Sequence, residues 1–434
     1  MYKKEVTEIE NMIQKQNLWR NKCINLIASE NVMSQRARSQ AGSDFAHRYA
    51  EGHPGERYYR GTSYIDEIEN QLKTNLKLIF ECDHAEVRPI SGTNANEAVF
   101  SRFVRPGDVV MVNSTPSGGH ISHHREGSIG KFTQNIIDFP MTEDGYHIDV
   151  EKTIYLIEKV KPKILVLGKS LFLFPEPVLD LIDLCRVYNV RIIYDAAHIL
   201  GLIAGRRFQN PIKEGAFLVT ASTHKTFFGS QRGIILSNME ESLWRKIDRG
   251  AFPGSSSNHH LDTLAQMAIC TYEMMEFGEQ YAEDTIKNAK ALASAMDRLG
   301  FDVQAKEFGY TETHQVAVNV KAFSGGEKVS RILEINDIIL NMNMLPHEPL
   351  SAHDHPEGIR IGVQEMTRFG MGEEEMVRIA ELIKECLMDK KSVKEEVNRF
   401  RSEYQDVKYS YDNLDPKKSE VVDYRTKEAI VSAN

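Results

Sequence analysis

The segments VRIIYDAAH (190–198) and AFLVTASTHKTFFGSQRG (216–233) decide the fold of this chain. Each begins as an uninterrupted run of apolar, largely branched residues and ends in polar side chains. Such runs are typical of strands buried on both faces of a mostly parallel sheet. Comparable runs are VVMVNS (109–114), KILVLG (163–168) and GIILSN (233–238), with helical patterns between them. The sequence therefore predicts an α/β architecture whose site lies beyond the carboxyl ends of the strands.

Two of these strand ends carry residues that together indicate a cofactor. Lys225 lies on a rigid strand end, where an amine can form a Schiff base with an aldehyde. Asp195 follows the other strand, where a carboxylate can keep a pyridinium nitrogen protonated and so make the ring an electron sink. Alone, Lys225 reads as a surface lysine and Asp195 as a helix cap or metal ligand. The pattern strand–Asp–x–x–His, then strand–Ser–x–His–Lys, is more specific and predicts a pyridoxal phosphate enzyme.

Two further motifs suit the rest of such a cofactor. ISGTNANEAVF (90–100) reads as a turn that opens a helix, and a helix N-terminus rich in hydroxyls can bind phosphate, although an ordinary capped helix has the same pattern. SGGHISHH (117–124) places His120 after two glycines, where its ring could stack on an aromatic cofactor. The crowded His120, His123 and His124 could instead suggest a metal, but their spacing fits no known ligand pattern. We expect no metal.

Composition excludes several other classes of protein. The 434 residues carry a net charge of −9 without a long basic run, which argues against nucleic acid as a partner. No stretch approaches the roughly 18 apolar residues that span a bilayer, and the charged N-terminus lacks the apolar core of a signal peptide. The five cysteines are odd in number and never form a CxxC pair, unlike a disulfide framework or a zinc site. We expect a reduced, cytoplasmic protein without membrane association.

The chain divides into four predicted parts. Residues 1–35 form an N-terminal arm, in which Val6, Ile9, Met12 and Ile13 predict a helix over 5–19 whose apolar face needs another surface, possibly a partner subunit. Residues 36–270 form the large domain and 271–390 a smaller α+β domain, bridged by a helical stretch over 259–298 that ends at a glycine. Residues 391–434 predict a charged surface helix and a loosely held tail.

At this level of detail the sequence resembles serine hydroxymethyltransferase. The motifs INLIASEN (24–31), HRYAEGHPGERYYRG (47–61), SGTNAN, GGHISH, YDAAHILGLIAG, STHKTFFG and GIRIGVQEMTRFG (358–370) match that family in order, over about residues 20–390. FPGSSSNHH and the HKTFFG context are most similar to the archaeal branch. The resemblance implies the aminotransferase-like fold of type I pyridoxal phosphate enzymes, with a mostly parallel sheet. It also implies a homodimer with active sites shared between subunits.

The resemblance assigns roles by position. Lys225 would form the internal aldimine, Asp195 would bind the pyridine nitrogen, His198 would approach the phenolic oxygen and His120 would stack on the ring. The phosphate would be held by Ser91, Gly92 and Thr93, with Ser222 and His224 beside them, and by Tyr49, Ser257 and Asn258 of the neighbouring subunit. Ser170 would also lie near the cofactor. The expected catalytic residues are Lys225, Glu51, Tyr59 and His224. The expected substrate-binding residues are Glu51, Tyr59 and Arg360, whose guanidinium would grip the carboxylate through two bonds.

The implied activity is interconversion of serine and glycine, with the one-carbon unit passed to tetrahydrofolate or a related tetrahydropterin. The same scaffold supports a threonine aldolase or transaldolase that joins glycine to another aldehyde, and a non-catalytic homologue is a third alternative. Departures from the family pattern at Ser230, Arg232, Lys169, Val363 and His347 bear on the acceptor. Arg232 and Lys169 either point into the cleft, where they would favour an anionic acceptor, or are solvated surface charges.

Overall fold

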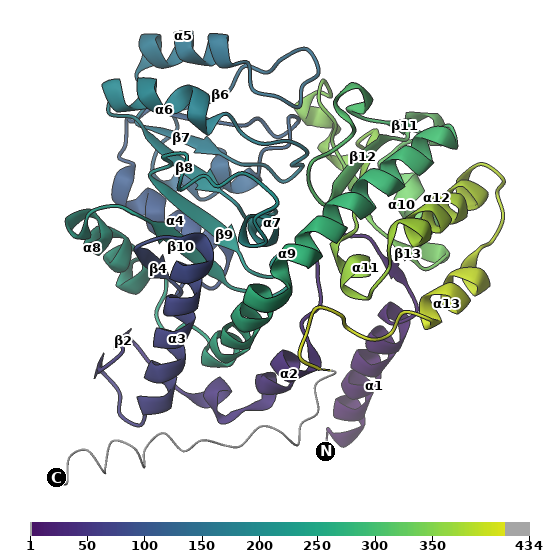
Figure 1. Cartoon of the computed structure of the whole chain (residues 1–434), viewed down its shortest axis with the longest axis horizontal. Helices are drawn as coiled ribbons and strands as arrows, with labels where there is room; N and C mark the ends of the chain where they lie inside the picture. The colour runs from purple at the N-terminus through teal and green to yellow at the C-terminus, as the bar shows by residue number, and fades with distance from the viewer. Residues whose placement is uncertain (1, 413–434) are drawn as a thin grey trace.

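The structure is a computed structural model that describes residues 2–412. It places a large sheet and its helices beside a smaller sheet, with the long helix α9 (Leu261–Arg298) running between them (Figure 1). The predicted tail beyond residue 412 lies outside the described residues. Within residues 2–412 no helix combines the length and apolar character that a membrane crossing requires.

The large domain is built on a seven-stranded sheet. Strands β9, β8, β7, β5 and β6 are mutually parallel, while β10 is antiparallel to both β9 and β4. The α/β prediction is confirmed, and all five apolar runs form strands. The strands in sheet order are β4 (His84–Glu86), β10 (Gly233–Ser237), β9 (Leu218–Ser222), β8 (Arg191–Asp195), β7 (Ile164–Leu167), β5 (Val110–Val112) and β6 (Ile136–Asp138).

Helices bury both faces of this sheet, which explains why its strands are apolar throughout. Successive strand residues point to opposite faces. Thus Met111 and Leu165 pack into one core cluster, whereas Val110 and Ile164 pack into another. The first face is covered by α3 (Ser63–Phe80), α5 (Val150–Val160), α6 (Val178–Val187), α7 (Leu200–Ala204) and the beginning of α9, and the second by α4 (Gly92–Phe103) and α8 (Glu241–Arg249).

The smaller domain is an antiparallel sheet with helices packed against it. Its strands in order are β11 (Asp302–Val303), β12 (Gln315–Asn319), β15 (Gly358–Gly362) and β14 (Asn341–Asn343), and its helices include α10 (Gly326–Ile335) and α12 (Glu373–Leu387). Helix α9 contributes Met267 to the large core and Met296 to the small one. Because α9 is continuous, the predicted boundary at residue 270 falls inside one helix, about 57 Å long at 1.5 Å per residue.

The N-terminal arm is a helix, α1 (Lys3–Arg20), as predicted, and none of its residues is buried. Its apolar face is open: Ile9 is 56% exposed and Met12 60%. The chain then enters the small domain, where β1 (Ile24–Asn25) pairs in parallel with β13 (Ile338–Ile339). The remaining helices and strands are α2 (Gln35–Arg38), β2 (Gly52–His53), β3 (Glu56–Arg57), α11 (Gln364–Arg368) and α13 (Lys394–Ser402).

Short helical turns complete the described chain. Single-turn 3₁₀ helices lie at Ser39–Gly42, Asp44–His47, Ile121–His123, Ile129–Lys131, Lys306–Phe308, Lys321–Phe323 and Leu350–Asp354, and a wider turn spans Gly250–Ser255.

Topology brings the chemistry-bearing strand ends to one edge. Strand β8 ends at Asp195, β9 ends at Ser222, and β7 ends at Leu167, shortly before Ser170. Because these three strands are parallel neighbours, their carboxyl ends meet where helix α4 begins.

Candidate active site

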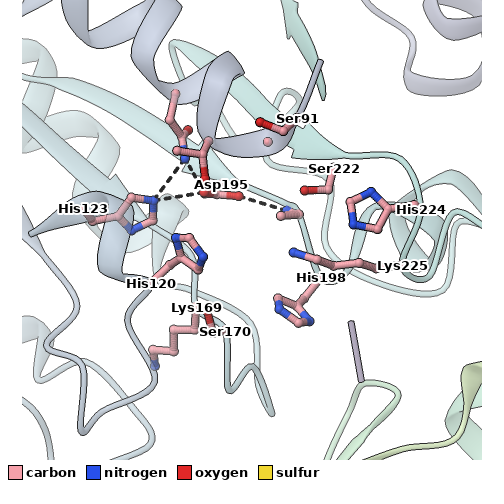
Figure 2. Close-up of a pocket in the computed structure, with 14 residues that line it drawn as sticks. Ser91, His120, His123, Lys169, Ser170, Asp195, His198, Ser222, His224 and Lys225 are labelled. Atoms are coloured by element: carbon pink, nitrogen blue, oxygen red, sulfur yellow. Dashed lines mark hydrogen bonds and ion pairs between the residues drawn. The ribbon is translucent and has the colours of Figure 1, made fainter. Parts of the chain in front are cut away.

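A cavity of about 190 Å³ lies at this edge of the sheet (Figure 2). Ten of the residues predicted from the sequence line it together. The lining residues are Ser91, Gly92, Thr93, Asn96, His120, His123, Lys169, Ser170, Asp195, Ala197, His198, Ser222, His224 and Lys225. They come from the ends of β7, β8 and β9, the beginning of α4 and the loop after β5.

The side chain of Lys225 carries a buried amine. Its backbone oxygen accepts a hydrogen bond from Asn31 Nδ2 at 2.7 Å, which fixes the loop. Its Nζ makes no hydrogen bond or ion pair with any residue between 2 and 412 and points into the cavity. Burial lowers the pKa of Lys225 to about 8, although the charge of Asp195 opposes this shift. The amine is therefore readily available in its neutral, nucleophilic form.

Asp195 is a buried carboxylate that is kept ionised. His123 Nε2 and Asn96 Nδ2 lie 2.9 Å and 2.8 Å from its Oδ2, and the Ala197 amide donates to Oδ1 at 3.0 Å. Burial alone would raise the pKa of Asp195, but the contacts with His123 and Asn96 hold it well below its usual range. A carboxylate can accept about four hydrogen bonds, so Oδ1 keeps one free site. A protonated ring nitrogen suits that site.

The beginning of helix α4 forms an anion cradle. Ser91 caps the helix, and its Oγ accepts from the amide three residues later at 3.1 Å. A Cβ at Gly92 would lie 2.4 Å from Ser222 Oγ, so any other residue there would displace this hydroxyl. Burial lowers the pKa of His224 to about 4, and its buried Nδ1 has no hydrogen-bond partner in the part of the chain that the structure describes. Helix amides, hydroxyls and an unsatisfied imidazole together fit a phosphate group.

His120 presents a neutral ring to the same cavity. Burial and the neighbouring His123 lower the pKa of His120 to about 4. Its Nδ1 accepts from the Ser122 amide at 3.1 Å, which orients the ring. With Lys225, Asp195 and the anion cradle, this ring completes a set of groups that fits pyridoxal phosphate. Within residues 2–412, no three His, Cys, Asp or Glu side chains are grouped so that they could hold a metal.

Arg360 lies on β15 beside the cavity, with part of its guanidinium unused. Nη1 donates to the Ser170 carbonyl oxygen at 2.7 Å, and Nε and Nη2 donate to Asn341 Oδ1 at 3.3 Å and 3.2 Å. Three of its five N–H groups are thus engaged, and one remains on each terminal nitrogen. No carboxylate in residues 2–412 pairs with Arg360, and burial lowers its pKa to about 10. A free donor on each of two neighbouring nitrogens fits a carboxylate.

The other five predicted site residues gather elsewhere, on the surface. Glu51 accepts from Tyr59 Oη at 3.3 Å and from Ser257 Oγ. Asn258 accepts from the Ala50 amide at 3.2 Å, and the Tyr49 and Tyr59 rings lie 5.3 Å apart. Tyr49 is 51% exposed. The single chain thus assembles these residues with one another but not into the lining of the Lys225 cavity. We call them the Glu51 cluster.

Arg232 is neither in the cleft nor on the surface, so both expectations for it are wrong. Its side chain is fully buried beneath the Lys225 loop. Its guanidinium donates to the carbonyls of Val87, His259 and His260 at 2.6–2.8 Å, and to Thr263 Oγ1 at 2.7 Å. These contacts hold the loop against residues 259–263, where α9 begins. The role of Arg232 is therefore structural.

Lys169 also departs from both expectations. Lys169 is among the residues that line the cavity, but its ammonium points away from the space between Asp195 and Lys225 (Figure 2). The ammonium donates to the Tyr146 carbonyl oxygen at 2.6 Å and pairs with Glu176 at 3.2 Å. The side chain is only 4% exposed, and its charge is already compensated. It supplies no free cation for an anionic acceptor.

The remaining departures lie in three different settings. Ser230 Oγ donates to the Thr263 carbonyl oxygen at 2.6 Å and so adds to the same loop anchor. Val363 is buried in the small-domain core. His347 is exposed, with φ of 74°, next to the tight turn at Gly145.

Sequence reasoning missed three contributors to the site. Asn96 donates to Asp195 and accepts from Thr220 Oγ1 at 2.6 Å, which orients its amide. His123 was considered only as a metal ligand, yet it contacts Asp195. Gln315 contacts His198 from the small domain. Asn96 lies one turn after the predicted phosphate turn, so helical spacing could have indicated it, whereas no local pattern indicates Gln315.

This chain is similar in sequence and in fold to known proteins. A family model described as serine hydroxymethyltransferase matches residues 2–383. Serine hydroxymethyltransferase of Methanosphaera stadtmanae is 47% identical over 408 residues, covering 94% of this chain and 96% of that protein. The Archaeoglobus fulgidus protein of the same name is 48% identical over 392 residues, covering 90% and 89%. A solved L-threonine transaldolase from Pseudomonas fluorescens, in its internal aldimine state, matches with a TM-score of 0.86 at 26% identity, covering 99% of this chain and 97% of that chain.

Proposed function

Since this chain belongs to the serine hydroxymethyltransferase family, we propose that the cavity beside Lys225 holds pyridoxal 5′-phosphate and is its active site. The chain is a pyridoxal-phosphate-dependent hydroxymethyltransferase of fold type I. It interconverts serine and glycine and transfers the one-carbon unit to a tetrahydropterin. The observation that carries the proposed site is the buried Lys225 amine, which has no partner among residues 2–412 and faces an ionised Asp195.

The contacts of the lining residues support the assignment of each of them to one part of the cofactor. When bound, the pyridoxal ring accepts the electrons that the broken Cα–Cβ bond releases. Lys225 would hold the cofactor covalently, and Asp195 would accept a hydrogen bond from the pyridine nitrogen. His120 would cover one ring face and His198 would face the phenolic oxygen. The phosphate would be bound by Ser91, Gly92, Thr93, Ser222 and His224, with Ser170 at the cavity edge.

Arg360 would orient the amino-acid substrate. Its two free N–H groups offer both donors that a carboxylate needs, and Asn341 and Ser170 fix the plane of the guanidinium. A carboxylate gripped at two points cannot rotate about a single contact. The scissile bond is then held in one direction relative to the cofactor, which is the positional part of catalysis.

The Glu51 cluster would complete the active site of a neighbouring subunit. Its glutamate and tyrosine already contact one another, as a proton-handling pair would. Tyr49, Ser257 and Asn258 lie with them on the surface, and the open apolar face of α1 gives a homodimer further area to bury. Glu51 would then move a proton at the substrate hydroxyl, next to the pterin. Light scattering should give twice the 49.4 kDa chain mass.

We propose an arm over 1–35, a cofactor domain over 36–270 and a small domain over 271–390, with a charged segment over 391–434. We also propose a cytoplasmic protein that works without nucleic acid or membrane partners.

The hydroxymethyltransferase activity is favoured over an aldolase or transaldolase. The relatives at 45–48% identity are named as hydroxymethyltransferases, whereas the transaldolase matches at 26%. Product analysis distinguishes the two: purified protein is given serine with and without tetrahydrofolate, and threonine with a second aldehyde. We expect rapid glycine formation from serine only with tetrahydrofolate. Equal rates without the pterin, together with transfer to the added aldehyde, would show that the transaldolase assignment is right.

A further inference from the structure

Gln315 contacts two residues that line the active-site cavity, Ser170 and His198. It is the first residue of β12 in the small domain, but its side chain crosses to the large domain. Oε1 accepts from the Phe172 amide at 2.9 Å, while Nε2 lies 3.0 Å from the Ser170 carbonyl oxygen and 3.0 Å from His198 Nδ1. Because the side chain is fully buried, the loss of any of these contacts would cost free energy.

The orientation of this amide is determined by its neighbours. The Phe172 amide can only donate, so the amide oxygen of Gln315 must face it. The Ser170 carbonyl can only accept, so it must face the NH₂ group. Rotating the amide by 180° would leave the Phe172 amide facing an NH₂ group and would bring the Gln315 amide oxygen against the Ser170 carbonyl oxygen. The NH₂ group therefore also faces His198 Nδ1.

This orientation decides which nitrogen of His198 carries the proton. Burial, with the charges of Lys225 and Arg360, holds the pKa of His198 well below its usual value, so the ring is neutral and has one N–H. Because the NH₂ group of Gln315 donates to Nδ1, this nitrogen must carry the lone pair of the neutral ring. The single ring proton is therefore on Nε2. Nε2 has no partner among residues 2–412, and His198 lines the cavity.

The neighbouring histidine does not compete for this role. His314 stacks on His198, with ring centres 5.9 Å apart. Its Nε2 donates to the Ala28 carbonyl oxygen at 3.1 Å. The 3.3 Å approach of Gln315 Nε2 to that nitrogen therefore brings two donors together and is no hydrogen bond. The two amide hydrogens of Gln315 remain for His198 and Ser170.

We propose that Gln315 is a positioning residue that holds His198 as the Nε2–H tautomer and so presents a hydrogen-bond donor to the cavity. In this tautomer Nε2 can donate a hydrogen bond to an anionic oxygen. It has no lone pair with which to accept a proton. That the receiving oxygen is the phenolic oxygen of the cofactor rests on the function proposed above. The tautomer itself does not, because it follows from contacts within the chain.

The tautomer can be measured directly by ¹⁵N NMR. The full chain is labelled with ring-¹⁵N histidine, and the His198 signals are assigned from their loss in His198→Asn. Spectra are recorded with the cofactor bound and after its removal. We expect a protonated Nε2 and an unprotonated Nδ1 in both states. Protonation of Nδ1 in the parent protein would overturn the proposal, whatever the variants do.

Gln315→Glu tests the cause. A carboxylate places an acceptor beside Nδ1, so the His198 proton should move to that nitrogen. Gln364→Glu is the matched control, because Gln364 is equally buried and its Nε2 donates to the carbonyls of Ile27 and Glu30, outside the cavity. The control should leave the His198 signals unchanged. An unchanged tautomer in Gln315→Glu would show that Gln315 does not set it.

Cofactor affinity separates this proposal from the proposed function. Gln315→Glu should weaken pyridoxal phosphate binding about tenfold, the effect of one lost hydrogen bond of about 1.4 kcal/mol. If the parent has the expected tautomer but binds no pyridoxal phosphate, the function fails and the tautomer stands. If Gln315→Glu moves the proton and the affinity is unchanged, the Nε2–H does not donate to the cofactor. Should Gln315→Glu fail to fold, the parent spectrum still decides the tautomer.

Discussion

Replacing Arg360 tests the proposed substrate site most directly. Arg360→Ala removes the two free N–H groups that the proposed substrate carboxylate would use, one on each terminal nitrogen. A hydrogen bond to a charged group contributes about 1.5–3 kcal/mol, so two contribute about 3–6 kcal/mol. Water can enter the emptied space and recover part of this. We therefore expect a loss of about 3–4 kcal/mol, or a fall in kcat/KM for serine of about 10²- to 10³-fold.

Arg360→Lys separates charge from geometry. Lysine keeps the positive charge but loses the planar pair of donors, so we expect a smaller fall in kcat/KM, about 10- to 100-fold. The assay is steady-state glycine formation with saturating tetrahydrofolate, with the absorption spectrum as a check on bound cofactor. Arg401→Lys is the control, because burial also lowers the pKa of Arg401 to about 10 but its helix lies outside the cavity. An unchanged KM for serine in Arg360→Ala would refute the proposed carboxylate site.

Other predictions address the amine, the shared cluster and the buried cation. Borohydride should trap pyridoxal phosphate on Lys225, and Lys225→Ala should lose multiple turnover; label on another lysine would contradict this. Because burial lowers the pKa of Lys225 to about 8, cofactor-free protein should rebind pyridoxal phosphate faster as pH rises to about 8 and then level off, measured by stopped-flow absorbance. Glu51→Gln should bind cofactor and serine but lose pterin-dependent cleavage, so full activity would exclude its proton-handling role. Arg232→Met should lower the free energy of unfolding by about 3–5 kcal/mol, whereas Arg245→Met, whose side chain is 72% exposed, should change it by less than about 1 kcal/mol; equal losses in denaturant titrations would show that the buried contacts contribute little.

Much of the fold and of the cavity could be predicted because both follow from local patterns. The strand runs before Asp195 and Ser222 are apolar on both faces, and parallel pairing brings their ends together. The short strands β4 and β6 could not be found in this way, since HAE (84–86) and IID (136–138) each contain a charged residue and form no apolar run. Their pairing depends on neighbours that are distant in sequence.

The surroundings of the cavity residues were harder to predict. We expected Arg232 to be a free cation because the carbonyl groups that surround it, those of Val87 and of His259 and His260, lie far from it in the sequence. Lys169 is compensated by Glu176, seven residues further on, a spacing that suggests no contact in an irregular loop. Gln315 acts from another domain. In each case the deciding partner is fixed by tertiary packing rather than by a motif.

The separation of the Glu51 cluster from the Lys225 cavity has a genetic consequence in the proposed dimer. Each polypeptide would supply Lys225 to one active site and the Glu51 cluster to the other. Mutations of Lys225 and of Glu51 in one polypeptide would therefore damage different active sites. A cell that carries one allele defective at Lys225 and another defective at Glu51 would assemble mixed dimers with one intact site and one doubly defective site. Random pairing would leave about a quarter of the sites intact, although neither allele gives an intact site by itself. Two alleles that are both defective at Lys225 would leave none.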